Sequence, residues 1–383
     1  MKGLINVSAY LYGSGVKKVS IGFEGDRIAY VGESAEGITP LADLPAEATV
    51  VAGFIDEHVH GAGGSDAMDG RVEALKTISD CLVKEGTTGF LATTMTQSKE
   101  RITQALQAVK HAVKSDEITG ARVLGAHLEG PFISLKHLGA QPREYVEEPS
   151  IALFEEYDAA SGGNVKIVTL APERAGGMQL VRYLWERGVV ASVGHSDATY
   201  SQMLDAVEQG AKSVTHLFNA QRGAHHREMG VVGSALLLDA LSCEIICDTL
   251  HLSVPAICLA LKNKPKDKVV LITDGMRAKG LPDGESELGG QTVIVKEGEA
   301  RLSDGTLAGS VLKMNDAIKS LVTQCGVPFT EAIDCATANP ARNIGIFEEY
   351  GSIEVGKYAD LTVLDEDFNV LLTVVGGNVV FRA

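Results

Sequence analysis

Two patterns of hydrophobic and polar residues divide the chain. Residues 1–50 and 346–383 alternate apolar and polar positions in short runs, with Gly and Asp between them, as in KKVSIGFEGDRIAYVGE. This alternation is typical of strands with one buried face. Because the ends of a chain often lie close together, we expect these two segments to form one small β-sandwich domain.

Residues 51–345 alternate short apolar runs with amphipathic stretches, the pattern of parallel strands connected by helices. We expect eight strands, at AGFIDEH, TGFLATT, RVLGAHLE, VKIVTLA, VVASVGH, SVTHLFN, CEIICDTLH and KVVLITD. An insertion at about 277–307 follows the last of them. Eight βα units fit a catalytic TIM (β/α)8 barrel better than an open doubly wound sheet, and no GxGxxG follows the first strand.

Composition narrows the class of protein. The 383 residues include 50 acidic and 34 basic side chains, so the formal charge is −16, and 45% are hydrophobic. This charge disfavours binding to nucleic acid or to an anionic membrane, although a few local Arg and His residues could still bind a small anion. There is no apolar run of membrane-spanning length, no signal-peptide pattern and no CxxC among six cysteines. We expect a cytoplasmic globular protein with no nucleic-acid or membrane partner.

Ionisable residues stand at the C-terminal ends of the predicted barrel strands, where the active sites of such barrels are built. In chain order they are His58, His60, Glu129, His195, His216 and Asp274. His58 and His60 lie two positions apart, so both face the same side of an extended segment and can contact one metal ion. Each of the six alone has an ordinary structural explanation, such as a loop histidine, a salt bridge or a helix cap. Their convergence favours a metal site, and a His/carboxylate set without Cys suits Zn²⁺, Fe²⁺ or another divalent ion.

Several motifs resemble a known group of enzymes. GFIDEHVHG, AHLEGPF, VGHSDA, THLFNA and LITDG, with the late ANPARNIG and GSIEVGKYADLTVLD, resemble the amidohydrolase superfamily from about residue 50 to residue 365. HLEGPF together with THLFNA is similar to the N-acetylglucosamine-6-phosphate deacetylase family. The resemblance implies hydrolysis of the acetamide of N-acetylglucosamine 6-phosphate to glucosamine 6-phosphate and acetate, in amino-sugar catabolism or cell-wall recycling.

The same resemblance implies roles in metal binding. Glu129, His195 and His216 match the main metal ligands of the family. His58 and His60 match the pair that, with the shared Glu, holds a second ion in some members. One or two ions per subunit are therefore implied, with zinc favoured and iron as an alternative.

Roles in catalysis and substrate binding are implied as well. Asp274 matches the catalytic acid/base of the family. In that family a metal-bound hydroxide is the nucleophile, and the acid/base transfers the protons. Asn219 and Ala220 match contacts to the sugar phosphate, and Arg227 and His251 match the remaining phosphate contacts. In relatives the Arg can reach across a dimer interface, so the resemblance implies a homodimer.

Gln141 departs from the family pattern. Some members place a His twelve residues after the HLEGP glutamate, where it helps to hold the reacting carbonyl, and Gln141 occupies that position here. An amide can still donate a hydrogen bond to a developing oxyanion but cannot become cationic. Either Gln141 does this work more weakly, with a second metal compensating, or the preference for acyl group or sugar differs.

Three alternative functions stay open. Cyclic-amide hydrolases of the superfamily typically bridge two metals with a carbamylated Lys at the end of the fourth strand, whereas VKIVTLAPE ends without Lys and Lys166 lies near its start. A catalytically inactive sugar-phosphate-binding barrel would be expected to lack ligands or the acid/base, and none is missing. N-acetylgalactosamine 6-phosphate is an alternative substrate because the sequence offers no contact that separates the two epimers.

Overall fold

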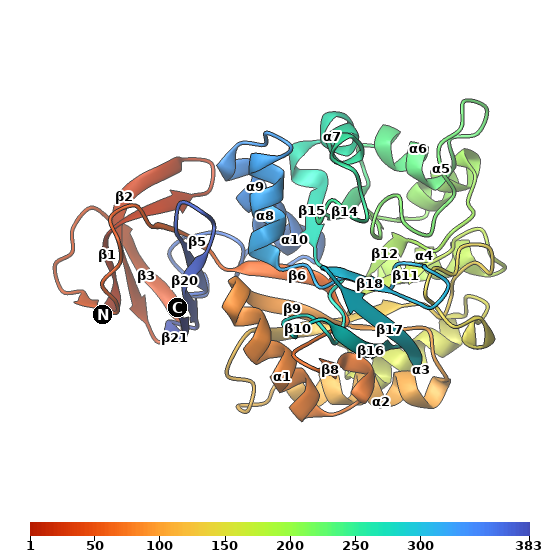
Figure 1. The fold of residues 1–383 in the computed structure, drawn as a ribbon, viewed down its shortest axis with the longest axis horizontal. Helices are drawn as coiled ribbons and strands as arrows, with labels where there is room; N and C mark the ends of the chain where they lie inside the picture. The colour runs from red at the N-terminus through yellow and green to blue at the C-terminus, as the bar shows by residue number, and fades with distance from the viewer.

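A parallel barrel stands beside a second sheet that both chain ends build, in a computed structural model that describes all residues, 1–383 (Figure 1). The barrel strands follow one another around the ring in chain order. They are β6 (Phe54–Val59), β9 (Thr87–Thr94), β10 (Arg122–Glu129), β11 (Val165–Leu170), β12 (Val190–Val193), β13 (Ser213–Val214), β14 (Ser242–Ile246) and β15 (Val269–Ile272). Val59 forms a parallel bridge with Gly275, just beyond β15, so the ring nearly closes. The predicted eight-stranded barrel is confirmed.

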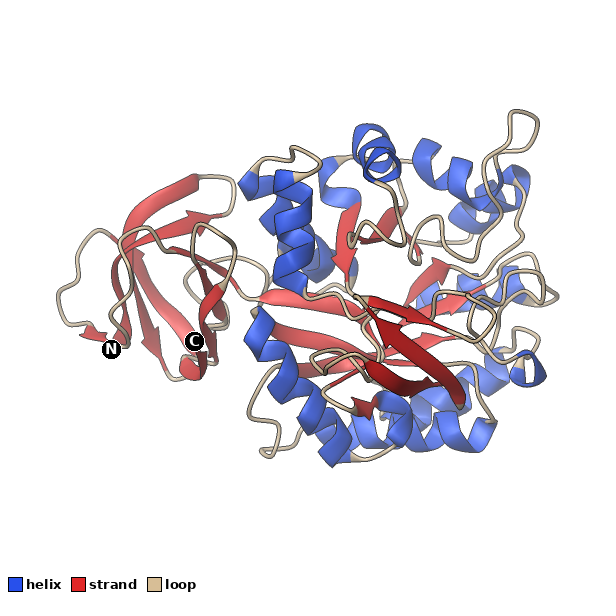
Figure 2. Ribbon diagram, in the orientation of Figure 1, coloured by secondary structure: helices blue, strands red, loops and turns tan.

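Helices cover the outside of the barrel (Figure 2). They are α1 (Val72–Leu82), α2 (Lys99–Ala112), α3 (Ile151–Ser161), α4 (Gly177–Glu186), α5 (Tyr200–Glu208), α6 (Gly230–Leu237), α7 (Val254–Asn263), α8 (Met314–Thr323), α9 (Phe329–Ala336) and α10 (Ala338–Asn343). In α1 the buried residues include Leu75, Ile78 and Leu82, a spacing that places them on one face of the helix. Such faces pack on the strands, because a helix with an apolar stripe must bury it against another element.

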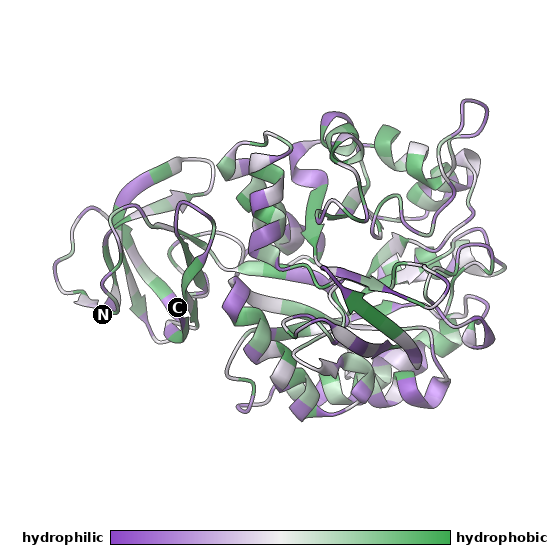
Figure 3. Ribbon diagram, in the orientation of Figure 1, coloured by the Kyte–Doolittle hydropathy of each residue, from purple (hydrophilic) through white to green (hydrophobic).

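The largest hydrophobic cluster joins barrel strands and helices and contains 69 buried residues. Figure 3 shows hydrophobic residues along β15, whose sequence VVLI is buried throughout. Strands covered on both faces read as continuous apolar runs, as the sequence predicted. This packed interior holds the strand ends, and the side chains that they carry, in fixed positions.

The terminal sheet joins the first and last strands of the chain. It contains β1 (Lys2–Leu11), β2 (Gly15–Glu24), β3 (Arg27–Gly32), β4 (Thr39–Pro40), β5 (Thr49–Ala52), β19 (Leu361–Leu364), β20 (Val370–Val375) and β21 (Asn378–Arg382). The link between the two ends is the antiparallel pairing of β5 with β19. A cluster of 16 buried hydrophobic residues draws on strands from both ends.

Three local features differ from the sequence-based expectations. The strand expected over SVTHLFN ends at Val214, because the backbone turns at His216 with a φ of 30°. The insertion at about 277–307 contains a small antiparallel sheet of β16 (Gly284–Leu288), β17 (Gln291–Lys296) and β18 (Glu299–Arg301). The short pair β7 (Gly61–Ala62) and β8 (Ser65–Asp66) follows β6.

None of the helices combines the length and the apolar character needed to cross a membrane.

Candidate metal and active site

Six ionisable side chains converge at the C-terminal mouth of the barrel. We call them the mouth cluster: His58, His60, Glu129, His195, His216 and Asp274. Each is at most 8% exposed. The chain turns sharply at three of them, since φ is 48° at His195, 30° at His216 and 49° at Asp274. Such left-handed backbone is uncommon for residues other than Gly and is concentrated at functional sites.

The Glu129 carboxylate lies at the centre of the cluster. Its Oε1 is 3.0 Å from Nε2 of His216, 3.2 Å from Nε2 of His195 and 3.6 Å from Nε2 of His58. Its Oε2 is 3.4 Å from Nε2 of His60. One carboxylate thus faces four imidazoles through the same ring nitrogen of each.

Asp274 faces the cluster from the end of β15. Its Oδ1 lies 3.3 Å from Nε2 of His60 and 3.5 Å from Nε2 of His58. The backbone N–H of Asp274 donates to the carbonyl of His58, which locks the loop after β15 against β6. Asp274 and Glu129 therefore approach the His58–His60 pair from two sides.

Hydrogen bonds on the far side of the rings leave Nε2 directed at the cluster. Nδ1 of His58 contacts Oε2 of Glu244 at 2.9 Å. Nδ1 of His60 and Nδ1 of His195 contact the backbone carbonyls of Thr93 at 3.2 Å and His137 at 2.8 Å. In a neutral imidazole these acceptors hold the one proton on Nδ1, so that Nε2 presents its lone pair toward the centre when a metal ion takes the place of the second proton.

The arrangement fits a divalent cation. Nε2 of His195 and Nε2 of His216 are 3.2 Å apart, and both face Glu129. Nε2 of His58 and Oδ1 of Asp274 are buried without a hydrogen-bond partner. Ligands at the ~2.0–2.2 Å typical of zinc, arranged tetrahedrally, lie ~3.3 Å from one another, which is the spacing found here.

The same atoms form two groups that could each hold an ion. In each group the ligand atoms lie within 4.8 Å of one another. One group is Glu129, His195 and His216, and the other is His58, His60 and Asp274. The donor set is imidazole and carboxylate without thiolate, which suits zinc, iron and similar divalent ions.

The carboxylates of the site favour positive charge on the histidines of the mouth cluster. Burial opposes protonation of His58, yet the Glu244 and Glu129 carboxylates outweigh burial and raise the pKa of His58 to about 9. For His60, the nearby carboxylates of Asp274 and Glu129 likewise overcome burial and raise its pKa well above the usual value. In return, and against the effect of burial, the histidines hold the pKa of Glu129 well below its usual value. The carboxylates therefore stay ionised and require cationic partners, whether protons or a metal ion.

A cavity of about 200 Å³ opens onto the cluster and brings together most of the predicted substrate contacts. Gln141, Asn219, Ala220 and His251 all line it. Nδ1 of His251 contacts Oδ2 of Asp248 at 2.6 Å, which fixes the ring. Apolar and loop residues complete the wall, among them Met95, Ala140, Leu288 and Leu307.

Gln141 is held between the backbone and the mouth cluster. Its Oε1 accepts a hydrogen bond of 2.8 Å from the backbone N–H of Thr96, and its Nε2 donates one of 2.6 Å to Oε2 of Glu129. Because Thr96 N–H can only donate, these two contacts set the orientation of the amide.

Arg227 is not part of this cavity. It lies in the loop before α6, exposed to solvent, and its Nη1 contacts Nε2 of His226 at 2.7 Å. Within one subunit the structure therefore does not bring Arg227 to the mouth cluster.

Sequence reasoning missed several residues of the site. Glu244 lies inside the apolar strand β14 and contacts His58, and the signal was a carboxylate within the run CEIIC, since a buried charge needs a partner. Leu288 and Leu307 come from the insertion, for which no pattern indicated a place at the cavity. His127 shares β10 with Glu129, but its ring contacts the carbonyl of Glu57 and the hydroxyl of Thr169.

Fold and site together define a barrel enzyme of the type that works with a divalent metal at the ends of its strands. The amidohydrolase family model matches residues 49–380. N-acetylglucosamine-6-phosphate deacetylase of Bacillus subtilis (strain 168) is 42% identical over 370 residues, covering 96% of this chain and 93% of that protein. N-acetylgalactosamine-6-phosphate deacetylase of Escherichia coli O157:H7 is 37% identical over 317 residues, covering 83% of this chain and 84% of that protein.

Solved structures agree with the sequence relatives. The crystal structure of N-acetylglucosamine-6-phosphate deacetylase from Thermotoga maritima matches with a TM-score of 0.90 and 34% identity, over 100% of both chains. The chain belongs to the amidohydrolase family. Within that family its similarity is to deacetylases of N-acetylhexosamine 6-phosphates.

Proposed function

We propose that this enzyme hydrolyses N-acetylglucosamine 6-phosphate to glucosamine 6-phosphate and acetate. The observation that carries the proposal is the mouth cluster itself: six buried His, Glu and Asp side chains, five of which line one cavity with His58 directly behind them. The relatives described above support the choice of substrate, and N-acetylgalactosamine 6-phosphate is the second candidate because one of them is named for it. A role in amino-sugar catabolism or cell-wall recycling follows from the same substrate.

The proposed metal ligands are Glu129, His195 and His216 for one ion, and His58 and His60 with Glu129 for a second. Zinc is the ion that we propose. When bound, a divalent ion of this kind polarises an amide carbonyl and lowers the pKa of a water molecule toward ~7.

Asp274 is the proposed general base and acid. Hydrolysis needs one group that takes a proton from the attacking water and gives a proton to the departing nitrogen, because an amine leaves poorly unless it is protonated. Oδ1 of Asp274 has no hydrogen-bond partner and Asp274 lines the cavity, so its carboxylate is free to accept and return that proton. Nearby histidines lower the pKa of Asp274 despite its burial, so the carboxylate is ionised and ready to act as a base.

Gln141, Asn219, Ala220 and His251 are the proposed substrate contacts of this subunit. One N–H of the Gln141 amide is engaged by Glu129, which leaves the second for the carbonyl oxygen of the acetamide. His251 is the cavity residue that we propose to contact the phosphate, and its pKa is raised because Asp248 outweighs the effect of burial.

Arg227 is the proposed phosphate contact in the site of a partner subunit, so the working unit is a homodimer. A guanidinium can donate two parallel hydrogen bonds to the oxygens of one phosphate. Arg227→Ala is expected to raise KM for the phosphorylated sugar by about 10-fold or more, from the loss of one charge-assisted contact, with a far smaller change for plain N-acetylglucosamine. Equal effects on both substrates would contradict the phosphate assignment.

The remaining proposals concern organisation. We propose that 1–50 and 346–383 form one domain and 51–345 the catalytic domain. The pairing of β5 with β19 supports one domain built from both chain ends, and because β5 runs to Ala52 the terminal sheet extends two residues past the proposed boundary. The net charge of −16 supports a protein without nucleic-acid or membrane partners. The cytoplasm is the location that we propose.

The central experiment is acetate release by the purified protein. N-acetylglucosamine 6-phosphate, its galacto epimer and plain N-acetylglucosamine would be compared, each with and without a chelator. We expect rapid, chelator-sensitive release from the first substrate. Faster release from the galacto epimer would favour the second candidate, and no release from any of the three by metal-loaded protein would contradict the proposed function.

A further inference from the structure

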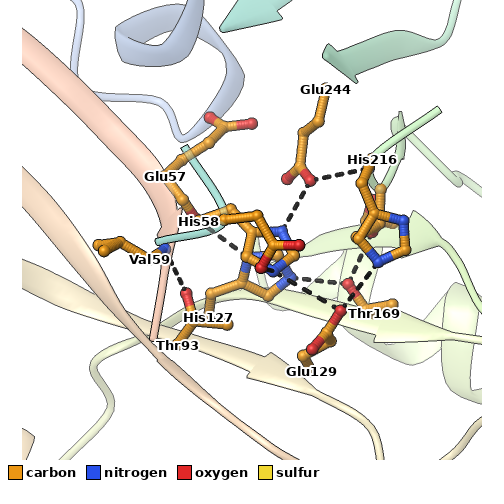
Figure 4. Close-up of polar contacts among 12 residues, drawn as sticks. Glu57, His58, Val59, Thr93, His127, Glu129, Thr169, His216 and Glu244 are labelled. Carbon is orange, nitrogen blue, oxygen red and sulfur yellow. Dashed lines mark hydrogen bonds and ion pairs between the residues drawn. The ribbon is translucent and has the colours of Figure 1, made fainter. Parts of the chain in front are cut away.

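Glu244 contacts His58 and His216, one member of each group of candidate ligands (Figure 4). It lies within β14, and its side chain is 1% exposed. Its Oε2 accepts a hydrogen bond from Nδ1 of His58 at 2.9 Å and another from the backbone N–H of His216 at 3.1 Å. An ionised carboxylate at such depth needs partners of this kind, because an unpaired buried charge is costly.

The contact with Glu244 determines what His58 presents to the site. A neutral imidazole carries one N–H, and a carboxylate can only accept, so the proton stays on Nδ1 and the lone pair on Nε2. That Nε2 has no hydrogen-bond partner and points between Oε1 of Glu129, at 3.6 Å, and Oδ1 of Asp274, at 3.5 Å. His58 is therefore held in the orientation and tautomer of a metal ligand.

Glu244 differs from the acceptors behind the other imidazoles. His60 and His195 are backed by the neutral carbonyls of Thr93 and His137. Nδ1 of His216 has no hydrogen-bond partner. A charged acceptor makes an imidazole a stronger donor of its lone pair than a neutral one does. Among the four rings, His58 alone receives this support from an anion.

Building on the proposed deacetylase and its second ion, we propose that Glu244 is the positioning residue that makes His58 a ligand and so determines whether the second ion binds. The effect runs through the imidazole of His58. The group of Glu129, His195 and His216 depends on it less, because Glu244 contacts His216 through the backbone alone. Loss of such a supporting carboxylate typically weakens metal affinity by about 10- to 100-fold.

The test is a Zn²⁺ titration of metal-free protein in competition with a chromophoric chelator. The wild-type chain is expected to take up two equivalents of Zn²⁺. Glu244→Gln keeps an oxygen for the N–H of His216 but loses the charge. We expect it to retain the first equivalent and to bind the second about 10- to 100-fold more weakly. Unchanged affinity of Glu244→Gln for the second equivalent would overturn the proposal. A wild-type chain that binds only one equivalent at saturating Zn²⁺ would overturn it as well.

Glu57→Gln is the matched control. Glu57 is also fully buried in the barrel, but its Oε1 accepts a hydrogen bond from Asn343 at 2.8 Å, and its carboxylate contacts no imidazole of the mouth cluster. This variant is expected to bind both equivalents as the wild type does. If Glu57→Gln weakens the second equivalent as much as Glu244→Gln, the effect belongs to the barrel interior in general and the proposal fails.

A double-mutant cycle shows whether Glu244 acts through His58. In a His58→Ala background, Glu244→Gln should cause no further loss of Zn²⁺ affinity, because the group through which it acts is gone. A full additional loss would overturn the proposal.

If Glu244→Gln does not fold, Glu244→Asp replaces it. This variant keeps the charge but moves it away from Nδ1 of His58. Weaker binding of the second equivalent of Zn²⁺ is again expected, and unchanged binding would count against the proposal.

Acetate release separates this inference from the proposed function. A wild-type protein that releases acetate while Glu244→Gln leaves Zn²⁺ binding unchanged would refute the role of Glu244 alone. A wild-type protein that binds two equivalents of Zn²⁺ and releases no acetate would refute the substrate, and the Zn²⁺ titration would still test Glu244.

Discussion

Two groups of buried charged side chains in the barrel are built differently. At the mouth cluster, carboxylates and imidazoles point at a shared centre and leave Nε2 of His58 and Oδ1 of Asp274 without partners. Beside it, Lys279 and Glu85 form a closed pair, with Nζ 2.6 Å from Oε1 and side chains 1% and 4% exposed. Charge is neutralised within the pair, whereas the cluster requires a cation to complete it.

The surroundings of the closed pair are also complete. Nζ of Lys279 lies 3.2 Å from the hydroxyl of Thr273, and that hydroxyl donates to Oδ2 of Asp56 at 2.5 Å. Thr273 precedes Asp274, so this network holds the end of β15. The fully partnered pair thus supports the scaffold, whereas the mouth cluster leaves ligand atoms free to meet a cation.

The largest expected effect is on turnover, from a substitution in the mouth cluster. Asp274→Asn should lower kcat by about 10²- to 10⁴-fold, because a positioned acid/base typically contributes that much. Zn²⁺ uptake and binding of the phosphorylated sugar should persist. Steady-state kinetics with metal analysis would measure this, and near-normal turnover would remove Asp274 from its role.

The closed pair should instead govern stability. Lys279→Met leaves Glu85 buried without its partner, so the free energy of unfolding is expected to fall by about 3–5 kcal/mol. Urea denaturation of the metal-free protein would measure the loss. Lys266→Met is the control, because Lys266 is 78% exposed and its pair with Glu331 should be worth under about 1 kcal/mol. Equal losses in the two variants would erase the distinction between a closed buried pair and a surface pair.

Replacing both Lys279 and Glu85 should have a smaller effect on the free energy of unfolding. Burial raises the pKa of Glu85 to about 7, although Lys279 opposes the shift. A carboxyl whose folded pKa lies above its unfolded value loses stabilising free energy as pH rises from the unfolded to the folded pKa. The wild type should therefore lose stability relative to Glu85→Leu/Lys279→Met between about pH 4.5 and about pH 7. Unfolding at several pH values would test this, and a constant difference would show that Glu85 does not titrate in that range.

Much of the architecture follows from local sequence pattern. Apolar runs separated by amphipathic stretches predict a parallel barrel, and residues at the ends of its strands must meet because parallel strands end at one face. His58, His60, Glu129, His195 and Asp274 were recognisable for that reason. The alternation at both chain ends likewise predicted the terminal sheet.

Other features depend on how distant segments meet in space. Glu244 on β14 reaches His58 on β6 across 186 residues and past β15, which lies between the two strands, and a periodicity of two or 3.6 residues carries no information about that distance. Gln141 is oriented by Thr96, and Leu288 enters the cavity from the insertion. The sequence by itself determined which ionisable residues gather and at which end of the barrel they lie. The tertiary structure alone decided which carboxylate supports which imidazole, because hydrogen bonds depend on ångström-scale distances that folding sets.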